Sequence, residues 1–170
     1  MQRSAAVELE LQPFHARHAE LVLSWVRSRE EADRWASAGA RELRPELLRE
    51  WHADADVHPY LCVDGGEPVG YGEVWHDGEA GEAELARILV APEERGRGVG
   101  RALTRLLAAK ARAAGFDEVW LRVVPDNEQA IAAYRAAGFA RASEKEERAF
   151  NVGQPLAYVW MRLESLLPSA

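Results

Sequence analysis

The 170-residue sequence has little or none of several features that mark other protein classes. It contains one cysteine, Cys62, so no disulfide can form within the chain, and we expect a reducing, cytoplasmic environment. Cys62 lies in the strand-like YLCV, where a buried and inert thiol is expected. No apolar run approaches membrane-spanning length, and the opening MQRSAAVELE lacks the apolar core of a secretion signal.

The sequence also lacks an excess of basic residues. Its formal net charge is −7, which argues against general nucleic-acid binding. Residues 1–84 hold 18 acidic and 8 basic residues, whereas residues 85–170 hold 10 acidic and 13 basic ones. The second half therefore suits an anionic ligand and the first half a cationic one, unless the acidic residues only keep the protein soluble.

The histidines have no spacing typical of a metal site. His15 and His18 have no nearby partner of ligand type in the sequence, and His76 is isolated. A zinc site needs three or four such ligands brought together, so we expect no metal.

What the sequence does contain is the pattern of one α+β domain over residues 1–170. Periodicity and turn residues predict two kinds of element. Strands are expected over 7–14, 59–64, 68–75, 82–90, 118–124, 140–150 and 156–163, and helices over 16–28, 45–53, 98–114 and 125–139. The last helix begins with a capping signature at Asp126 and Gln129 and ends at Gly138. Hairpins combined with one strand–helix–strand unit predict a mixed sheet flanked by helices.

The stretch PEERGRGVGRAL, residues 92–103, places three glycines between a predicted strand and a predicted helix. Glycine permits a close backbone approach, and a helix N-terminus offers unpaired N–H groups with a partial positive charge. Together they predict an anion site, most naturally for phosphate, with a tight connection without ligand as the alternative. The loop is neither a Walker loop, since Arg101 and Ala102 follow Gly100, nor a complete dinucleotide fingerprint.

Two motifs in this order resemble the GNAT superfamily of N-acetyltransferases. The first, Arg/Gln-x-x-Gly-x-Gly/Ala, is complete as Arg95-Gly96-Arg97-Gly98-Val99-Gly100. The second is an Asn that opens a helix, a Tyr seven residues later and then Gly-Phe, present as Asn127, Tyr134, Gly138 and Phe139. The resemblance covers residues 7–163. It implies a mostly antiparallel mixed sheet with a V-shaped splay between the fourth and fifth strands, and pyrophosphate of coenzyme A as the anion.

The resemblance implies a binding site for acetyl-coenzyme A. Backbone amides from Gly96 to Arg101 would approach the pyrophosphate, and Arg95, Arg97 or Arg101 would add charged contacts. Main-chain groups of Ile88, Leu89 and Val90 would hold the pantetheine arm, and one of their amides would polarise the thioester carbonyl. Asn127 and Tyr134 would meet the cofactor from the other side of the cleft.

The resemblance also implies direct attack of an amine on the thioester, without an acyl-enzyme. Tyr134 is the predicted general acid, because a phenol of pKa about 10 stays protonated at neutral pH; packing against Ile131 is its structural alternative. Glu84, eleven residues before Arg95, is the first candidate for the base, and Glu73 on the preceding strand is the second. Either would act directly or through a water, and a solvated glutamate at a sheet edge is the alternative for both.

The acceptor is predicted to be a primary amine, either a small cation or part of a peptide or protein. Its wall is expected from the loop 151–155 and from aromatic and acidic residues of the first helices: Phe14, Trp25, Trp35, Glu30, Glu31 and Asp33. Aromatic residues at such positions are more often part of the core. Arg122, in Leu121-Arg122-Val123, stands where ribosomal-protein N-terminal acetyltransferases place a glutamate, which argues against a peptide N-terminus.

Two other functions fit the same motifs. A non-catalytic acyl-coenzyme A sensor or scaffold would keep the cofactor site without turnover. An enzyme that transfers a longer acyl group would keep both the cofactor site and turnover. Dimers are frequent in the family, so the resemblance leaves a homodimer open.

Overall fold

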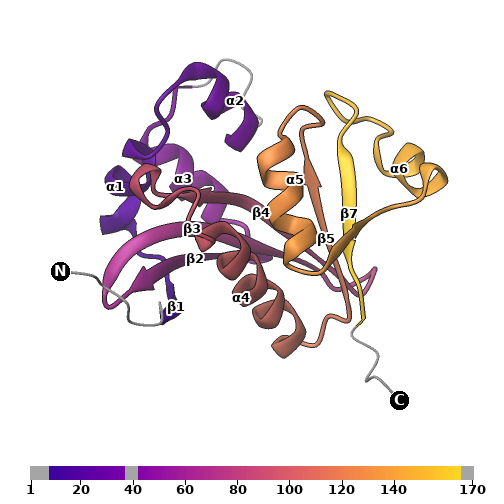
Figure 1. The fold of residues 1–170 in the computed structure, drawn as a ribbon, viewed down its shortest axis with the longest axis horizontal. Coiled ribbons are helices and arrows are strands. Elements are labelled where there is room, and N and C mark those ends of the chain that lie inside the picture. The colour runs from indigo at the N-terminus through magenta and orange to yellow at the C-terminus, as the bar shows by residue number, and fades with distance from the viewer. Residues whose placement is uncertain (1–7, 37–41, 166–170) are drawn as a thin grey trace.

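The computed structural model describes residues 8–36 and 42–165, which form a seven-stranded sheet with helices on both faces (Figure 1). The strand order is β1-β2-β3-β4-β5-β7-β6. The strands are β1 (Leu9–Pro13), β2 (Val57–Asp64), β3 (Glu67–Asp77), β4 (Glu82–Val90), β5 (Glu118–Val123), β6 (Phe139–Arg141) and β7 (Val159–Leu163). The helices are η1 (Ala16–His18), α1 (Ala19–Ser24), α2 (Arg29–Ala36), α3 (Pro45–His52), η2 (Pro92–Glu94), α4 (Val99–Ala113), α5 (Glu128–Ala136) and α6 (Glu144–Phe150).

The sheet opens between β4 and β5. All neighbouring strands are antiparallel except these two, which are parallel because α4 crosses between them. Their pairing runs only from Glu82 to Leu85 on β4, against 118–121 on β5. The second half of β4 has no β5 partner in the described residues, so the predicted mixed sheet and its V-shaped splay are confirmed.

A β-bulge bends β4 at the point where it leaves β5. Glu73 pairs with Ala86 and Tyr71 pairs with Leu89, so two residues of β4 lie opposite one residue of β3. Arg87, inside the bulge, has φ of +48°, and among the described residues no other non-glycine residue has a positive φ. This strained backbone is held in place by contacts of Arg87 that are described below.

One hydrophobic core lies between the sheet and α4. Leu103 and Leu107 of α4 are fully buried in it, together with the strand residues Val74 and Leu121. The helix comes so close to β3 that a Cβ atom at Gly72 would lie 2.5 Å from Cδ1 of Leu107. Cys62 is buried in this core, and burial raises the pKa of its thiol to about 11, which fits the expected inert thiol.

The opposite face of the sheet carries a second core under α1, α2 and α3. Val22 of α1, Trp35 of α2 and Leu48 of α3 pack there on Tyr71 of β3. Figure 1 shows that these helices cover one half of the sheet and that α6 lies at the other half, beside β7. Part of this sheet face is therefore left between α3 and α6.

Two predicted elements were wrong. Residues 16–28 do not form one helix: η1 and α1 end at Ser24, and α2 begins at Arg29. Residues 140–150 are not a strand, since β6 ends at Arg141 and α6 follows from Glu144. The sequence signal for α6 was a capping box, in which Ser143 and Glu146 bond each other's backbone N–H groups.

The cap of α5 also differs from the prediction. The side chain of Asn127, not that of Asp126, accepts the hydrogen bond from the Ala130 N–H. Asp126 instead forms an ion pair with Arg34 of α2 at 3.2 Å. Gly138 stops the helix as predicted, with φ of +102°. In the described part of the chain, no helix is long and apolar enough to cross a membrane.

Candidate functional site

A groove of about 730 Å³ follows the opening between β4 and β5. Its walls are the unpaired half of β4, the glycine loop (residues 95–98), the first turn of α4 and the facing side of α5. Most residues predicted for the site line this groove: Glu84, Ile88, Leu89, Val90, Arg95, Gly96, Gly98, Gly100, Arg101, Asn127 and Tyr134. Arg97 and Val99 are not part of its lining.

The glycine loop turns its backbone toward the groove. Gly96 and Gly98 have φ of +74° and +83°, a region that favours glycine, and Gly98 is the N-cap of α4. A Cβ atom at either glycine would meet no atom within 4 Å, so the space in front of the loop is open. The first intrahelical bond runs from the Ala102 N–H to the Gly98 carbonyl, which leaves the preceding amides of the first turn for an anion.

The three arginines of the glycine loop and the first turn of α4 have different partners. Arg95 donates to the Val90 and Trp25 carbonyls at 3.0 and 3.2 Å and forms an ion pair with Glu31 of α2. Arg95 therefore ties the loop to the N-terminal helices. Arg97 pairs with Glu94 at 3.3 Å, and Arg101, which is exposed, has no ion pair among the described residues. Arg101 is thus the arginine best placed to contact an anion.

Tyr134 and Asn127 stand two helical turns apart on the face of α5 that borders the groove. Tyr134 is half-buried, and it packs at the edge of the α4 core together with Ile131. Burial raises the pKa of its hydroxyl to about 12, so the phenol stays protonated at neutral pH. Tyr134 therefore contributes to packing and also presents a protonated group beside the groove.

Glu84 borders the opening in the sheet. It forms an ion pair with Arg122 of β5 at 2.8 Å, and Arg122 also donates to the Gln154 side chain at 2.8 Å. The Glu84 side chain keeps 20% of its surface accessible. Burial raises the pKa of Glu84 above its ordinary value, and the charge of Arg122 only partly offsets this effect.

Glu73 has no accessible surface and lines neither this groove nor the second cavity described below. Its carboxylate accepts hydrogen bonds from Tyr71 at 2.5 Å and from Trp75 and Arg87 at 2.7 Å each. Burial alone would raise the pKa of Glu73, but these donors and His52, 3.4 Å away, outweigh burial and lower it. Glu73 thus holds Arg87, the bulge residue, by a buried ion pair.

Three tryptophans also contact Arg87, the residue inside the bulge. Trp35 of α2 donates to the Arg87 carbonyl at 2.7 Å, and the Arg87 guanidinium lies over the Trp51 ring, 3.7 Å from its centroid. The Trp75 ring is 4.9 Å away on β3. The backbone of Arg87 is therefore fixed by contacts from α2, α3 and β3.

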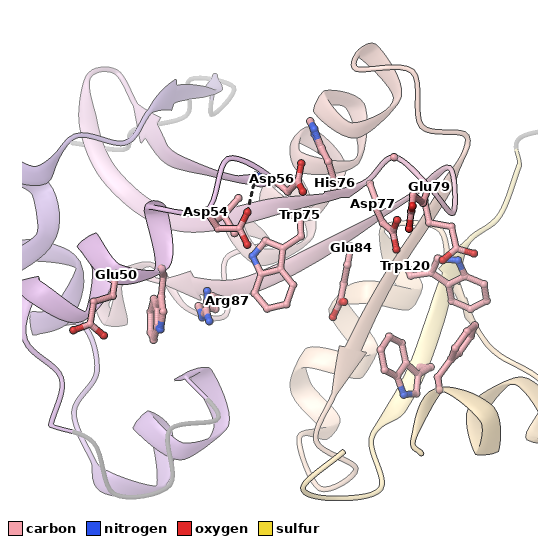
Figure 2. A pocket seen from close by; sticks show the side chains of 17 residues that line it. Glu50, Asp54, Asp56, Trp75, His76, Asp77, Glu79, Glu84, Arg87 and Trp120 are labelled. Atoms are coloured by element: carbon pink, nitrogen blue, oxygen red, sulfur yellow. Dashed lines mark hydrogen bonds between the residues drawn. The ribbon is translucent and has the colours of Figure 1, made fainter. Parts of the chain in front are cut away.

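A second cavity of about 840 Å³ lies on the sheet face between α3 and α6 (Figure 2). We call it the acidic trough, because seven carboxylates line it: Glu50, Asp54, Asp56, Asp77, Glu79, Glu82 and Glu84. Four indoles belong to the same lining: Trp51, Trp75, Trp120 and Trp160. Trp75, Glu84 and Arg87 line both the trough and the groove, so the two cavities meet at the opening of the sheet.

The acidic trough was not predicted, and three residues expected at the acceptor wall, Phe14, Trp25 and Asp33, do not line the groove. Trp25 is 5% exposed in the core, and Phe14 packs edge-on against Tyr71 at 5.3 Å; neither lines the groove or the acidic trough. Trp35, Glu30, Glu31, Gln154 and Pro155 line the groove, as expected of a wall, whereas Asp33 does not. The sequence signal of the acidic trough was the acidic excess of the first half of the chain, which is strongest in residues 51–84, with nine acidic residues and no lysine or arginine.

The histidines are placed differently from the expectation in one respect. His76 is not isolated, because its ring stacks on His58 with 4.0 Å between the centroids. Within residues 8–36 and 42–165, no three His, Cys, Asp or Glu side chains are grouped so that they could hold a metal ion.

Comparisons with known proteins agree with this architecture. Residues 19–139 match the model of the acetyltransferase (GNAT) family. The chain is 39% identical to N-alpha-acetyltransferase RimI of Mycobacterium tuberculosis over 127 residues, which cover 74% of this chain and 77% of that protein. It is 39% identical over 88 residues to streptothricin acetyltransferase of Streptomyces lavendulae, covering 51% of this chain but only 47% of that protein.

A solved structure gives the same fold at low sequence identity. The aminoglycoside acetyltransferase AAC(6')-Ib, in complex with coenzyme A and kanamycin, superposes with a TM-score of 0.72 and 21% identity. The match covers 93% of this chain and 95% of that one. At this identity the likeness concerns the fold alone.

Proposed function

The chain belongs to the acetyltransferase (GNAT) family, and on this basis we propose that it transfers an acetyl group from acetyl-coenzyme A to a primary amine. The observation that carries the proposal is the meeting of the groove and the acidic trough at Glu84, where the sheet opens. A donor in the groove and an acceptor in the trough would meet there without leaving their own binding surfaces.

The groove fits coenzyme A in shape and charge. The open space before Gly96 and Gly98 and the amides of the first turn of α4 suit a diphosphate, with Arg101 beside them. The main-chain groups of Ile88, Leu89 and Val90, left without a β5 partner, would hold the extended arm. When bound, acetyl-coenzyme A supplies an activated acetyl group at the opening.

Glu84 is the proposed general base. An acceptor amine arrives largely as an ammonium, and it must lose a proton before it can attack. A carboxylate with a raised pKa at the junction is better suited to remove that proton than Glu73, which lines neither cavity. Glu73 remains a candidate only through an indirect effect, because it holds Arg87 and thereby the bend of β4.

Tyr134 is the proposed general acid. In the transfer, the bond from the acyl carbon to nitrogen forms and the bond from that carbon to sulfur breaks. Tyr134 gives its proton to the departing sulfur and regains one from the nitrogen, while the first ammonium proton leaves through Glu84 to solvent. A main-chain amide of residues 88–90 would meanwhile stabilise negative charge on the carbonyl oxygen.

Arg122 argues for a small amine rather than a peptide N-terminus as acceptor. Arg122 stands where the ribosomal-protein N-terminal acetyltransferases place a glutamate. It is paired with Glu84, and an arginine cannot serve as a base at neutral pH. The similarity to the N-alpha-acetyltransferase RimI therefore does not by itself define the acceptor.

Thiol release from acetyl-coenzyme A, measured across a panel of primary amines, tests the proposed function. We expect release that depends on the acceptor. Tight binding of coenzyme A with no release for any amine would instead identify a sensor or scaffold, and competition with longer acyl-coenzyme A compounds would reveal a different donor.

A further inference from the structure

The acidic trough has two groups of carboxylates with Glu84 between them (Figure 2). Asp54 and Asp56 follow α3 at one end. Asp77 and Glu79 lie at the β3–β4 turn at the other end, where Asp77 pairs with Glu82 in the sheet register. A single primary amine at Glu84 would leave both groups without a role.

Much of the negative charge of the trough is not balanced by ion pairs, although Glu84 is paired with Arg122. Arg87 is the one arginine or lysine in the described lining, and it is bonded to Glu73. Among the described residues, no ion pair involves Asp54, Asp56, Asp77, Glu79 or Glu82. Burial, together with the charges of Asp77 and Glu118, raises the pKa of Glu82, as expected where like charges gather. Such a surface attracts cations.

The floor of the trough provides a second and independent indication of a ligand. Trp120 is 5% exposed, and its Nε1 donor has no hydrogen-bond partner among the described residues. Buried donors in folded proteins nearly always have a partner, so an acceptor atom from a bound molecule would complete this one. The trough indoles already receive cations of the protein: the Arg122 guanidinium lies 5.7 Å from the Trp75 centroid and 5.2 Å from the Trp160 centroid.

We infer that the acceptor is a polycationic amine, with one amine at Glu84 for acetylation and further ammonium groups held by the carboxylates at the ends of the trough. The inference rests on the proposed function, since it assigns Glu84 to the reacting amine. Linear aliphatic polyamines and hydroxylated amino sugars share this chemistry. A hydroxyl oxygen of the ligand that accepts a hydrogen bond from the Trp120 Nε1–H would favour an amino sugar over a linear polyamine.

The test compares three acceptors at saturating acetyl-coenzyme A: spermidine, kanamycin and butylamine, a monoamine. We expect kcat/KM for at least one polycation to exceed that for butylamine by about 100-fold. Raising the salt concentration should increase KM for the polycation and leave that for butylamine nearly unchanged. A higher kcat/KM for kanamycin than for spermidine identifies an amino sugar, and the reverse identifies a linear polyamine. Equal values for all three overturn the inference.

The double variant Asp77→Asn with Glu79→Gln removes charge from one end of the trough. Asn keeps an oxygen for the hydrogen bond from the Ala80 N–H. We expect KM for the preferred polycation to rise about tenfold with kcat unchanged, since these residues bind and do not react. Glu67→Gln, an exposed charge at the other end of β3, is the matched control and should change neither constant. An unchanged KM in the double variant overturns the inference.

The failure of this inference can be distinguished from failure of the proposed function. If butylamine is acetylated efficiently and the double variant has no effect, the protein is an acetyltransferase without specificity for polycations. The proposed function then stands and the inference fails. If no amine releases thiol, calorimetric titration with spermidine and kanamycin still tests the trough. Binding that the double variant weakens would support it, and absence of binding would overturn it.

Discussion

Glu73 and Glu84 lie on neighbouring strands of one sheet face, two register positions apart, yet their surroundings are opposite. Glu73 is fully buried and accepts hydrogen bonds from three side chains. Glu84 is paired with Arg122 and borders both cavities. A carboxylate surrounded by donors becomes a weak base and holds structure, whereas one at a cavity with a raised pKa can still take up a proton.

Arg87 connects the two carboxylates. Glu73 and Trp35 fix its side chain and its carbonyl, and its positive φ bends β4 away from β5. The bend opens the sheet next to Glu84. Glu73 thus supports the shape of the site from the core, and Glu84 supplies its chemistry.

The largest expected effect comes from Glu84→Gln. We expect kcat to fall about 10³-fold, because the amide cannot accept the ammonium proton. Affinity for coenzyme A, measured by calorimetry, and the thermal midpoint should stay close to those of the wild type. Activity within a few-fold of the wild type would remove Glu84 from the mechanism.

Glu73→Gln should act on stability instead. The variant leaves Arg87, whose side chain is only 16% exposed, without its paired carboxylate, which should lower the free energy of unfolding by about 3 kcal/mol in urea titrations. Turnover of the folded fraction should fall far less than in Glu84→Gln. A stable variant with a 10³-fold lower kcat would exchange the roles of the two carboxylates.

Tyr134→Phe removes the proposed acid on the other side of the opening. We expect kcat to fall about 10²-fold, because the departing sulfur must take its proton from water. The ring remains packed beside Ile131, so affinity for coenzyme A and stability should hardly change. Wild-type turnover in this variant would leave Tyr134 a packing residue only.

The smallest expected effect is on the pH dependence of stability. Glu73 and Glu84 should change the free energy of unfolding in opposite directions as the pH rises. The pKa of Glu73 is lowered in the folded protein, so its stabilising contribution is present above about pH 4.5 and is lost as the pH falls through the folded pKa. The pKa of Glu84 is raised, so its ionisation costs stability as the pH rises from about 4.5 through the folded value.

Urea titrations at several pH values, each comparing wild type with one Gln variant, measure these two contributions. From acid to neutral pH, wild type should gain stability relative to Glu73→Gln and lose stability relative to Glu84→Gln. If both stability differences between wild type and variant change in the same direction with pH, the two carboxylates do not have opposite pKa shifts.

Local sequence patterns predicted most of the fold and one side of the site. Strand 82–90 and the glycine loop were recognisable because alternation, glycine and the following helix act within a few neighbouring residues. Asn127 and Tyr134, seven residues apart, share a helix face for the same reason. Their specific roles in transfer remain predictions.

What the sequence could not predict depends on contacts between distant segments. The bulge at Arg87 is held by Trp35, Trp51 and Glu73, which come from three different elements. The acidic trough gathers carboxylates from α3, its following loop and the β3–β4 turn, so only their shared charge was visible. Helix α6 is different, because its signal is local and lies in the capping box of Ser143 and Glu146.

The central claim is that main-chain amides at residues 96–101 bind the diphosphate of coenzyme A, and calorimetric titration of Gly98→Val tests it most directly. Gly65→Val, which forces the same residue into a positive φ at the distant β2–β3 turn, controls for backbone strain. The account predicts wild-type affinity in folded Gly65→Val and no measurable binding in folded Gly98→Val. Normal affinity in Gly98→Val, or a wild-type protein that ignores coenzyme A at millimolar concentration, would contradict it.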